Sequence, residues 1–179
     1  MNSKQFLSAL AVILVMAVLV MGAAFLLHGP AMDHYIQEKK DVVHFVLPES
    51  ESFTEELDRG DDESIQKVYK GQTGYVIEVE VPGYVDTIRV MVGVDNDGTV
   101  RGVTIRSMKE TLGLGTQALT DYEFLMQFLY TQGEAQVGED VDALTGATVT
   151  SKAITRAVNI AVGYVTGADT SSGATSWGG

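Results

Sequence analysis

Four hydroxyl side chains stand close together in the segment TGATVTSKAI, residues 145–154, where their spacing could bind an anion. They are Thr145, Thr148, Thr150 and Ser151. Apolar residues at helical spacing predict a helix over residues 151–165 that begins near Thr150 or Ser151. The first turn of a helix offers unpaired backbone N–H groups and the positive end of the dipole, which suit a phosphate, and Lys152 adds charge. The alternative is ordinary N-capping, which needs only one hydroxyl.

A second segment, KETLGLGTQALTD at residues 109–121, contains a closely spaced glycine pair. Gly113 and Gly115 follow a predicted strand and precede a predicted helix, as in a weak phosphate loop. A Gly-x-Gly pair is more often a wide turn, so this signal is poor evidence by itself. Glu110 could hydrogen-bond a polar heterocycle or simply be solvated.

Several other chemistries are disfavoured by residue content. The absence of Cys excludes disulfides, thiolate nucleophiles, Cys-ligated zinc and iron–sulfur clusters. His28, His34 and His44 all precede the predicted sheet and lack metal-ligand spacing, and no nucleophile-elbow motif occurs. An electron carrier of this composition would therefore need another cofactor.

The 179-residue chain is strongly acidic, with a net charge of −12. Of its 12 basic and 24 acidic residues, only Lys4 lies within the first 27 positions, so the remainder carries a net charge of −13. No basic face is available to neutralise nucleic-acid phosphates or to dock on anionic lipid, and both kinds of partner are disfavoured.

Residues 6–27 are uncharged, and Ser8 is their only polar side chain. As a helix of 22 residues they extend about 33 Å, enough for a hydrocarbon core of about 30 Å. A signal peptide cleaved near residues 22–24 is the alternative, but its apolar region is usually only about 7–15 residues long. Lys4 and the acidic domain predict a cytoplasmic N-terminus and an extracytoplasmic domain, although Lys39 and Lys40 argue weakly against this orientation.

The patterning predicts an α+β fold in which one N-terminal transmembrane helix precedes a small antiparallel-sheet domain with packed helices. We expect four parts: an anchor at 1–28, a membrane-proximal connection at 29–63, a folded domain at 64–166 and a flexible tail at 167–179.

The elements of the folded domain follow from alternation and turn signals. Residues 64–106 alternate apolar and polar side chains around an Asp-Asn-Asp-Gly turn at 95–98, and predict three or four antiparallel strands. A helix is expected at 121–130, before the one at 151–165. Within the connection, residues 42–48 (VVHFVLP) are strand-like, and the acidic run that follows reads as solvated.

Three stretches together resemble a known family. Gly83-Tyr84 and the following IRVMVGVD (88–95) resemble a glycine–tyrosine turn and central hairpin. ETLGLG (110–115) is similar to a Glu-Thr-Pro-Gly-Leu-Gly signature, with Leu112 in place of the Pro. DALTGAT (142–148), continuing to Ser151, matches a flavinylation motif, with Thr145 in place of the commoner Ser. These are features of the FMN-binding domain shared by the G subunit of the Rnf electron-transport complex and the C subunit of the sodium-pumping NADH:quinone oxidoreductase.

The resemblance implies how a cofactor would be held. In that family a flavin transferase moves FMN from FAD onto the Thr of Gly-Ala-Thr as a phosphoester. This implies covalent FMN at Thr148, with Asp142 recognised by the transferase. Further cofactor contacts are expected from Glu110, Thr111, Leu112, Gly113, Leu114, Gly115, Thr145, Gly146, Ala147, Thr150, Ser151 and Lys152.

The resemblance and the short chain imply membership of an Rnf-type ion-translocating ferredoxin:NAD oxidoreductase complex in the cell membrane. FMN would relay electrons between neighbouring membrane subunits, so catalysis would belong to the complex. The alternatives are a flavoprotein component of the sodium-pumping NADH:quinone oxidoreductase, a stand-alone extracellular flavoprotein, and a non-redox membrane-anchored binding module.

The flavinylation motif occurs a second time, as DTSSGAT at residues 169–175. The spacing from Asp169 to Thr175 equals that from Asp142 to Thr148. Only the first copy precedes a predicted helix, which marks Thr148 as the working site. Thr175 is either a second attachment site or a coincidence in a tail rich in Ser, Thr and Gly.

Overall fold

The computed structural model divides the chain into two units, residues 1–41 and 42–179. It describes residues 15–18, 42–109, 115, 118 and 121–168. In the first unit, residues 15–18 are helical and exposed, and the rest of the expected span at 6–27 lies outside the described residues. Within the described part of the chain, no helix is both long and apolar enough to cross a membrane.

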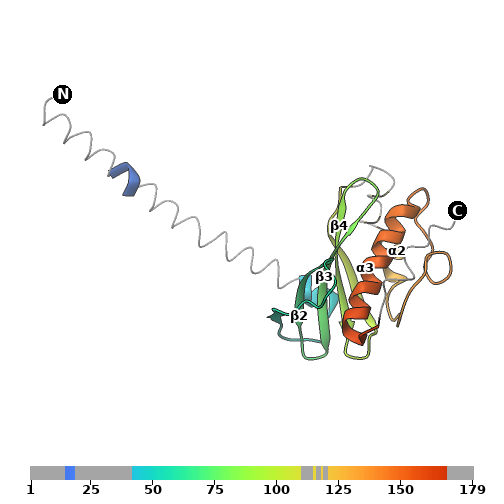
Figure 1. The fold of residues 1–179 in the computed structure, drawn as a ribbon, viewed down its shortest axis with the longest axis horizontal. Coiled ribbons are helices and arrows are strands. Elements are labelled where there is room, and N and C mark those ends of the chain that lie inside the picture. Colours follow the sequence, from blue (N-terminus) through green and yellow to red (C-terminus); the bar gives the residue numbers. More distant parts are fainter. Residues whose placement is uncertain (1–14, 19–41, 110–114, 116–117, 119–120, 169–179) are drawn as a thin grey trace, which may run out of the picture. The chain divides into compact units, whose positions relative to one another are not determined.

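The second unit is built on an antiparallel sheet in which each strand pairs with the next along the chain. Its strands are β1 (Thr54–Glu56), β2 (Ile65–Lys70), β3 (Gly74–Pro82), β4 (Thr87–Asp95) and β5 (Val100–Ser107). Two named helices follow, α2 (Tyr122–Met126) and α3 (Thr148–Thr166). Figure 1 shows α3 beside the sheet, where it packs on β3 and β4. The predicted α+β class is confirmed.

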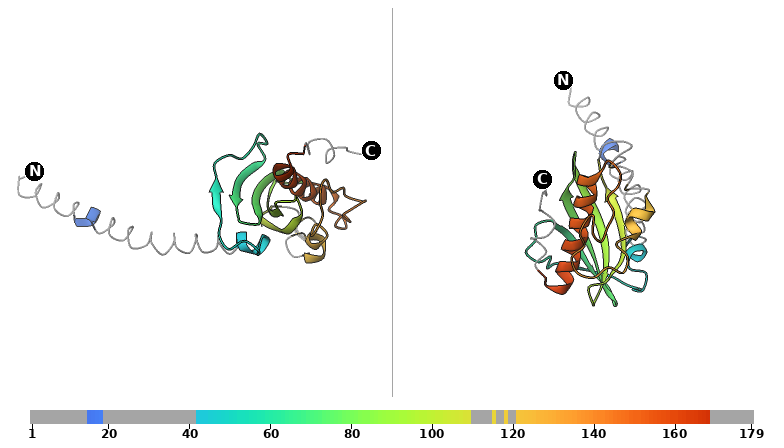
Figure 2. Two further views of the ribbon diagram at one scale, coloured as in Figure 1. Left: turned by 90° about the horizontal axis from the view of Figure 1, so that it is seen from below. Right: turned by 90° about the vertical axis from the view of Figure 1, so that its right-hand side faces the viewer.

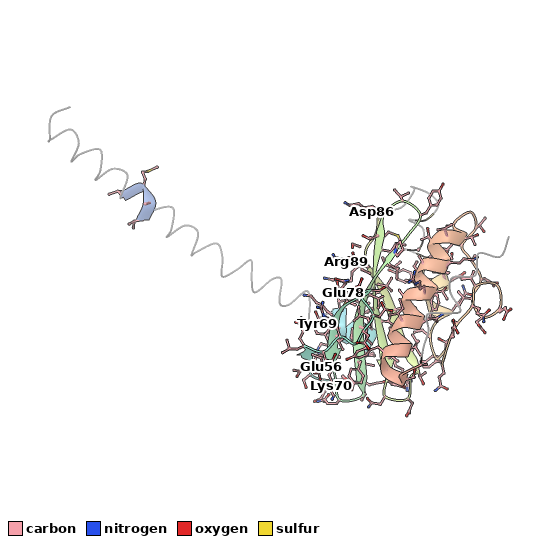
Figure 3. All side chains as sticks on the ribbon, viewed as in Figure 1. Glu56, Tyr69, Lys70, Glu78, Asp86 and Arg89 are labelled. Carbon is pink, nitrogen blue, oxygen red and sulfur yellow. The ribbon has the colours of Figure 1, made fainter. Side chains whose placement is uncertain are left out.

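The sheet has one strand more than the alternation pattern indicated. Strand β1 lies in the acidic run that we expected to be solvated, and it pairs with β2 with Glu55 opposite Tyr69. An ion pair of 4.0 Å joins Glu56 to Lys70 across the same strands (Figure 3). Pairing with a neighbouring strand can recruit a segment whose own side chains are too polar to signal a strand.

One face of the sheet forms the main core with α3. Alternate residues of β3 and β4 point to this face and are buried, among them Ile77, Val79, Val90 and Val92. The apolar stripe of α3 packs on them: Ile154, Ala157, Val158, Ala161 and Val162. Figure 2 shows the sheet curving around this helix. The predicted apolar face of the helix is confirmed.

Both helices differ in length from their sequence patterns. Helix α3 begins at Thr148 rather than near Thr150 or Ser151, and Gly167 ends it with a left-handed φ of 71°. Helix α2 was expected over 121–130 but ends at Met126. The chain then turns so that the Tyr130 N–H donates to the Val100 carbonyl at 2.8 Å, and this pairing with β5 replaces continued helix.

The opposite face of the sheet is covered by residues 42–47. The strand expected at 42–48 is wrong, since residues 42–46 are helical. Helical spacing brings Val43, Val46 and Leu47 to one side, where they pack in a second apolar cluster. Their partners on the sheet are Tyr69, Val76 and Met91. The compact unit therefore includes part of the segment expected to be a connection.

Two glycines make room for this helical segment. Gly93 on β4 pairs with Gly102 on β5, so both lie at one place on the sheet. A Cβ built on Gly93 would stand 2.0 Å from the Val46 carbonyl oxygen, and one on Gly102 would stand 2.6 Å from it. The backbone of residue 46 therefore rests directly on the backbone of the sheet.

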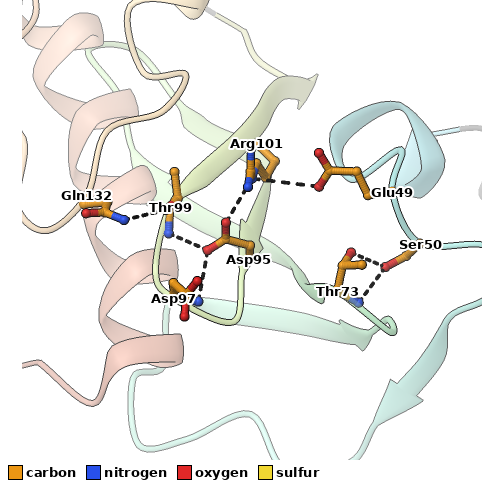
Figure 4. A network of polar contacts seen from close by, with 8 residues as sticks. All are labelled: Glu49, Ser50, Thr73, Asp95, Asp97, Thr99, Arg101 and Gln132. Carbon is orange, nitrogen blue, oxygen red and sulfur yellow. Dashed lines mark hydrogen bonds and ion pairs between the residues drawn. The ribbon is translucent and has the colours of Figure 1, made fainter.

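The β4–β5 hairpin is closed by one carboxylate. Asp95 is only 7% exposed, and its Oδ1 accepts from the N–H groups of Thr99 at 2.8 Å and Asp97 at 3.0 Å. Its Oδ2 accepts from Arg101 Nε at 2.9 Å, and Arg101 also lies 3.8 Å from Glu49 (Figure 4). Burial alone would raise the pKa of Asp95, but these hydrogen bonds and the Arg101 charge hold it below its usual value.

Replacing Gly93 with Ala tests the contact with residue 46. Ala is normally the better strand residue, yet here its Cβ must displace the Val46 carbonyl, so we expect the free energy of unfolding to fall by about 1–3 kcal/mol. Denaturation of the full chain in detergent measures this, and hydrogen exchange should rise at residues 42–47. The exposed Thr87→Ala change on the same strand is the control. An unchanged unfolding midpoint in Gly93→Ala would contradict the contact.

Asp95 is expected to make stability depend on pH. Because its pKa is lowered in the folded state, its contribution is present above the unfolded pKa of about 3.9 and is lost as pH falls through the folded pKa. Asp95→Asn should lower stability at pH 7 by about 1–3 kcal/mol and flatten its fall in acid. Denaturant titrations from pH 7 to pH 3 check this. Exposed Asp97→Asn should keep the wild-type acid dependence, and the same dependence in Asp95→Asn would refute the assignment.

Candidate functional site

The segment before α3 folds into a tight turn. The Ala147 N–H donates to the Leu144 carbonyl at 3.0 Å, and Gly146 has a φ of 75°. Among the described non-glycine residues only Tyr130 has a positive φ, so the first central residue, Thr145, keeps a negative one. This combination is a type II turn, which requires glycine at its second central position. The turn leaves Thr145 and Gly146 exposed.

Ser151 fastens this turn from beneath. Its hydroxyl accepts from the Leu144 N–H at 3.0 Å and donates to the Ala147 carbonyl at 3.0 Å, and its side chain is fully buried. Thr150 is also buried, with 2% exposure. The structure thus divides the four hydroxyls of the sequence motif. Thr145 and Thr148 face solvent, whereas the hydroxyl of Ser151 has a structural task.

The start of α3 offers donors and an exposed hydroxyl. Thr148 is the first helical residue, and the N-cap is Ala147, which makes no side-chain capping bond. Ordinary side-chain capping of this helix, the alternative raised by the sequence, is therefore not what the structure shows. No acidic residue lies in the first turn, and Lys152 is partly exposed. The N-terminal partial charge of α3 is thus left uncompensated by its own first turn.

The loop that leads into the turn is held by two amide side chains. Gln127 Oε1 accepts from the Asp142 N–H at 2.8 Å, and Asp142 itself is exposed. Buried Asn159 on α3 accepts from the Ala135 N–H and donates to the Ala135 carbonyl, both at 2.9 Å. Sequence reasoning missed both amides, although a polar Asn within an apolar helix face was a signal.

These contacts form a polar line along α3. Ser151, Thr155 and Asn159 are spaced four residues apart, so they share one side of the helix, and all three are buried. Thr155 Oγ1 donates to the Ser151 carbonyl at 2.9 Å. A helix that is otherwise an apolar core element thereby fixes the loop that carries Asp142 and Thr145.

The second sequence motif is only partly described. Glu110, Thr111, Leu112, Gly113 and Leu114 lie outside the described residues, whereas Gly115 is buried. Just before this segment, Lys109 Nζ lies 3.9 Å from Asp86 Oδ2 in the turn between β3 and β4. The same turn contains Gly83 and the exposed Tyr84. Lys109, the residue before the second stretch, therefore lies close to the turn that contains Gly83 and Tyr84 of the first stretch.

The described residues contain no group of three or more His, Asp or Glu side chains that could hold a metal ion.

Comparison with known proteins identifies the domain. Residues 83–163, from the β3–β4 turn into α3, match the family described as the FMN-binding domain. The chain is 31% identical over 156 residues to the G subunit of the proton-translocating ferredoxin:NAD(+) oxidoreductase complex of Clostridium ljungdahlii, covering 83% of each chain.

Two further relatives are the corresponding components of similar complexes. The G subunit of the Na(+)-translocating ferredoxin:NAD(+) oxidoreductase complex of Acetobacterium woodii is 29% identical over 126 residues, which is 63% of this chain and 61% of the relative. That of the ion-translocating oxidoreductase complex of Methanosarcina acetivorans is 31% identical over 144 residues, 72% and 76% respectively. The chain therefore belongs to the family of G subunits of Rnf-type ion-translocating oxidoreductase complexes and contains its FMN-binding domain.

Proposed function

We propose that this chain is the membrane-anchored electron-transfer subunit of an Rnf-type ion-translocating ferredoxin:NAD oxidoreductase, and that it carries FMN in a phosphoester bond to Thr148. The observation that carries the proposal is the position of Thr148. Its side chain is exposed at the first residue of α3, inside the matched FMN-binding domain and at the last position of the flavinylation motif.

The residues around Thr148 fit a phosphate. A phosphoester there keeps negative charge, which the first-turn N–H groups of α3 can stabilise because Ala147 provides no competing side-chain oxygen. Lys152, one turn along, adds positive charge, and no acidic side chain in the first turn opposes it. Thr145 and Gly146 border the same exposed surface. These residues would hold the phosphate end of the cofactor.

The attachment reaction follows from these groups and from FAD as the donor. The Thr148 hydroxyl oxygen forms a bond to the FMN-side phosphorus of FAD, the pyrophosphate P–O bond breaks, and AMP leaves. The hydroxyl proton passes to a base of the flavin transferase. The exposed carboxylate of Asp142 would be recognised by that enzyme, and the type II turn presents the hydroxyl to it.

FMN, when bound, supplies the one- and two-electron chemistry that no side chain of this protein offers. The chain itself holds the attachment point still. Ser151 and Asn159 fix the turn and the preceding loop to α3, and α3 is fixed to the sheet by its apolar face. The protein would thus act as a relay between neighbouring membrane subunits of the complex.

The anchor proposal rests on residues 6–27, with the N-terminus in the cytoplasm and the flavin domain outside. The support is the length of this apolar stretch, the Lys4 charge before it and the acidic domain after it. A covalent bond would also prevent loss of the cofactor outside the cell.

Orientation can be checked with right-side-out membrane vesicles. Protease added outside should remove an epitope tag fused after Gly179 and spare one fused before Met1, because only the domain is exposed on that side. Detergent should then allow removal of both tags. A C-terminal tag that survives until detergent is added would overturn the orientation.

Thr148→Val tests the attachment site. Valine keeps the shape but removes the hydroxyl, so flavin should vanish from the tryptic peptide 110–152, which contains Thr148 as its only complete flavinylation site. Mass spectrometry of the chain co-expressed with a flavin transferase measures this, and Thr148→Ser should keep the modification. Flavin that remains on this peptide in Thr148→Val would remove the proposal.

Ser151→Ala is the matched comparison, because it removes a hydroxyl that supports the turn without facing the cofactor. The buried Leu144 N–H would lose its acceptor, which should lower stability by about 1–3 kcal/mol. Thr148→Val should leave the unfolding midpoint near that of the wild type. Equal midpoints in Ser151→Ala and the wild type would contradict the supporting role of Ser151.

A further inference from the structure

We propose that a groove beside strand β5 binds an apolar segment of a neighbouring membrane subunit of the complex. The groove lies between β5, helix α2 and the helical segment 42–46, and its volume is about 290 Å³. This inference rests on the part of the proposed function that places the chain among other membrane subunits, and it is independent of the flavin at Thr148.

The groove exists because the helical segment covers only part of its face of the sheet. Val46 rests on Gly102 of β5, and Phe45 beside it lines the groove. Farther along β5, Thr104 and Ile105 also line the groove and stay partly exposed. Helix α2 packs on β5 and forms the other wall, and Figure 2 shows it beside the helical segment.

Three large apolar side chains stand around the groove with most of their surface exposed. Phe45 is 67% exposed, Tyr122 is 69% exposed and Met126 is 62% exposed. They come from two segments that lie far apart in the sequence, so only the fold brings them together. A cluster of exposed apolar side chains around one hollow is typical of an interaction surface.

Tyr130 extends the same surface. It follows Leu129, which lines the groove, and it is 72% exposed with a φ of 65°. Bulky residues rarely adopt such a positive φ, and here the pairing with Val100 maintains it. The Tyr130 ring centre lies 5.8 Å from Arg101 Cζ. The turn after α2 therefore keeps another aromatic ring at the surface next to the groove.

The charges around the groove favour an apolar occupant. Among the described residues that line it, Arg101 alone is charged, and its guanidinium already contacts Asp95 and Glu49. The chain after residue 27 has 11 basic and 24 acidic residues, a net charge of −13. An almost uncharged hollow on so acidic a chain has the composition of a protein–protein interface core, where charged residues are depleted and Tyr, Phe and Met are enriched.

The place where the chain enters the domain indicates which partner is near. Phe45 is three positions after residue 42, where the folded unit begins. Fourteen residues, 28–41, separate that point from the proposed anchor, so it stays within about 50 Å of the membrane. The relatives belong to ion-translocating oxidoreductase complexes, so neighbouring membrane subunits are the proteins within this range.

The shape of the groove favours a protein over lipid. A hollow with Phe45 on one side and α2 on the other accepts projecting side chains, whereas a bilayer surface presents no fixed projection. The acidic domain also disfavours docking on anionic lipid. The occupant is therefore an apolar protein segment with side chains such as Leu, Ile or Phe.

The absence of Cys allows single cysteines to report on the groove. Tyr122→Cys places a thiol at its rim, and Leu57→Cys is the control, because Leu57 is 97% exposed and follows β1 at the opposite edge of the sheet. In the full-length chain purified alone in detergent, a polar maleimide should label both. In the complex purified from membranes, labelling of Tyr122→Cys should be lost and the control should still react. Equal labelling of both in the complex would overturn the proposal.

Cross-linking identifies what covers the groove. A thiol-directed photo-crosslinker on Met126→Cys should join this chain to another membrane subunit of the complex, and mass spectrometry of the joined peptides should show an apolar segment. The same reagent on Leu57→Cys should not reach that segment. Products with lipid, with a second copy of this chain or with its own C-terminal tail would each refute the assignment.

A charge in the groove tests its part in assembly. Tyr122→Glu alters an exposed position but places a carboxylate in the apolar contact, so the amount of chain that co-purifies with the other subunits should fall about tenfold or more. Leu57→Glu should leave that amount unchanged. Both variants should keep the unfolding midpoint of the wild type. Undiminished co-purification of Tyr122→Glu would contradict the proposal.

Failure of the groove and failure of the flavin site are distinguishable. Labelling of Tyr122→Cys in a complex whose peptide 110–152 carries flavin would refute the groove alone. Protection of Tyr122→Cys without flavin on that peptide would remove the attachment at Thr148 and leave the groove in place. A chain that purifies from membranes without other subunits would overturn the groove together with the proposed place in a complex.

Discussion

The architecture depends on the close contact between the carbonyl of Val46 and the paired glycines of β4 and β5. Because Gly93 and Gly102 have no side chains, the backbone of the helical segment 42–46 can contact the backbone of the sheet at this point. Val46 is fully buried there. This segment is the first part of the folded unit after the proposed anchor. The contact therefore determines where the chain enters the domain, and it covers one face of the sheet.

With both faces of the sheet covered, strand β4 becomes a buried element. From Val90 to Asp95, β4 is buried at every position, because α3 covers one face and residues 42–47 cover the other. A strand held in this way gives α3 a firm base. Asp95 at the end of β4 accepts hydrogen bonds from Thr99 in the turn and from Arg101 on β5. These bonds fix the edge strand β5 to β4.

The sequence predicted the parts of this fold whose signals are local. Alternation identified β3, the Asp-Asn-Asp-Gly turn identified the β4–β5 hairpin, and helical spacing identified α3. It failed where contacts distant in sequence decide. Residues 42–46 read as a strand because Val and Phe favour strands, and their contact with the sheet depends on Gly93 and Gly102, which lie far away in the sequence. Helix α2 stops early because Tyr130 pairs with Val100.

In the candidate site, too, the sequence predicted what depends on local signals and missed what depends on contacts distant in sequence. Residue types indicated Thr148 and the glycine of the turn, since both belong to a short contiguous motif. They could not separate Thr145 from Ser151, because four neighbouring hydroxyls look alike in a sequence. Ser151 is distinguished by its two bonds to the turn, and these exist only once α3 is packed. Asn159 and Gln127 act on loop residues 15 or more positions away, beyond any local pattern.

This division explains how one short motif can serve two purposes. Its exposed residues carry the information that a modifying enzyme can read, and its buried residues carry the information that the fold needs. The two sets alternate along seven residues, so a sequence pattern alone treats them as one signal. For the flavin proposed at Thr148, attachment and placement are therefore distinct properties. The first needs only a readable surface, and the second needs the turn that Ser151 fastens and the helix that packs on the sheet.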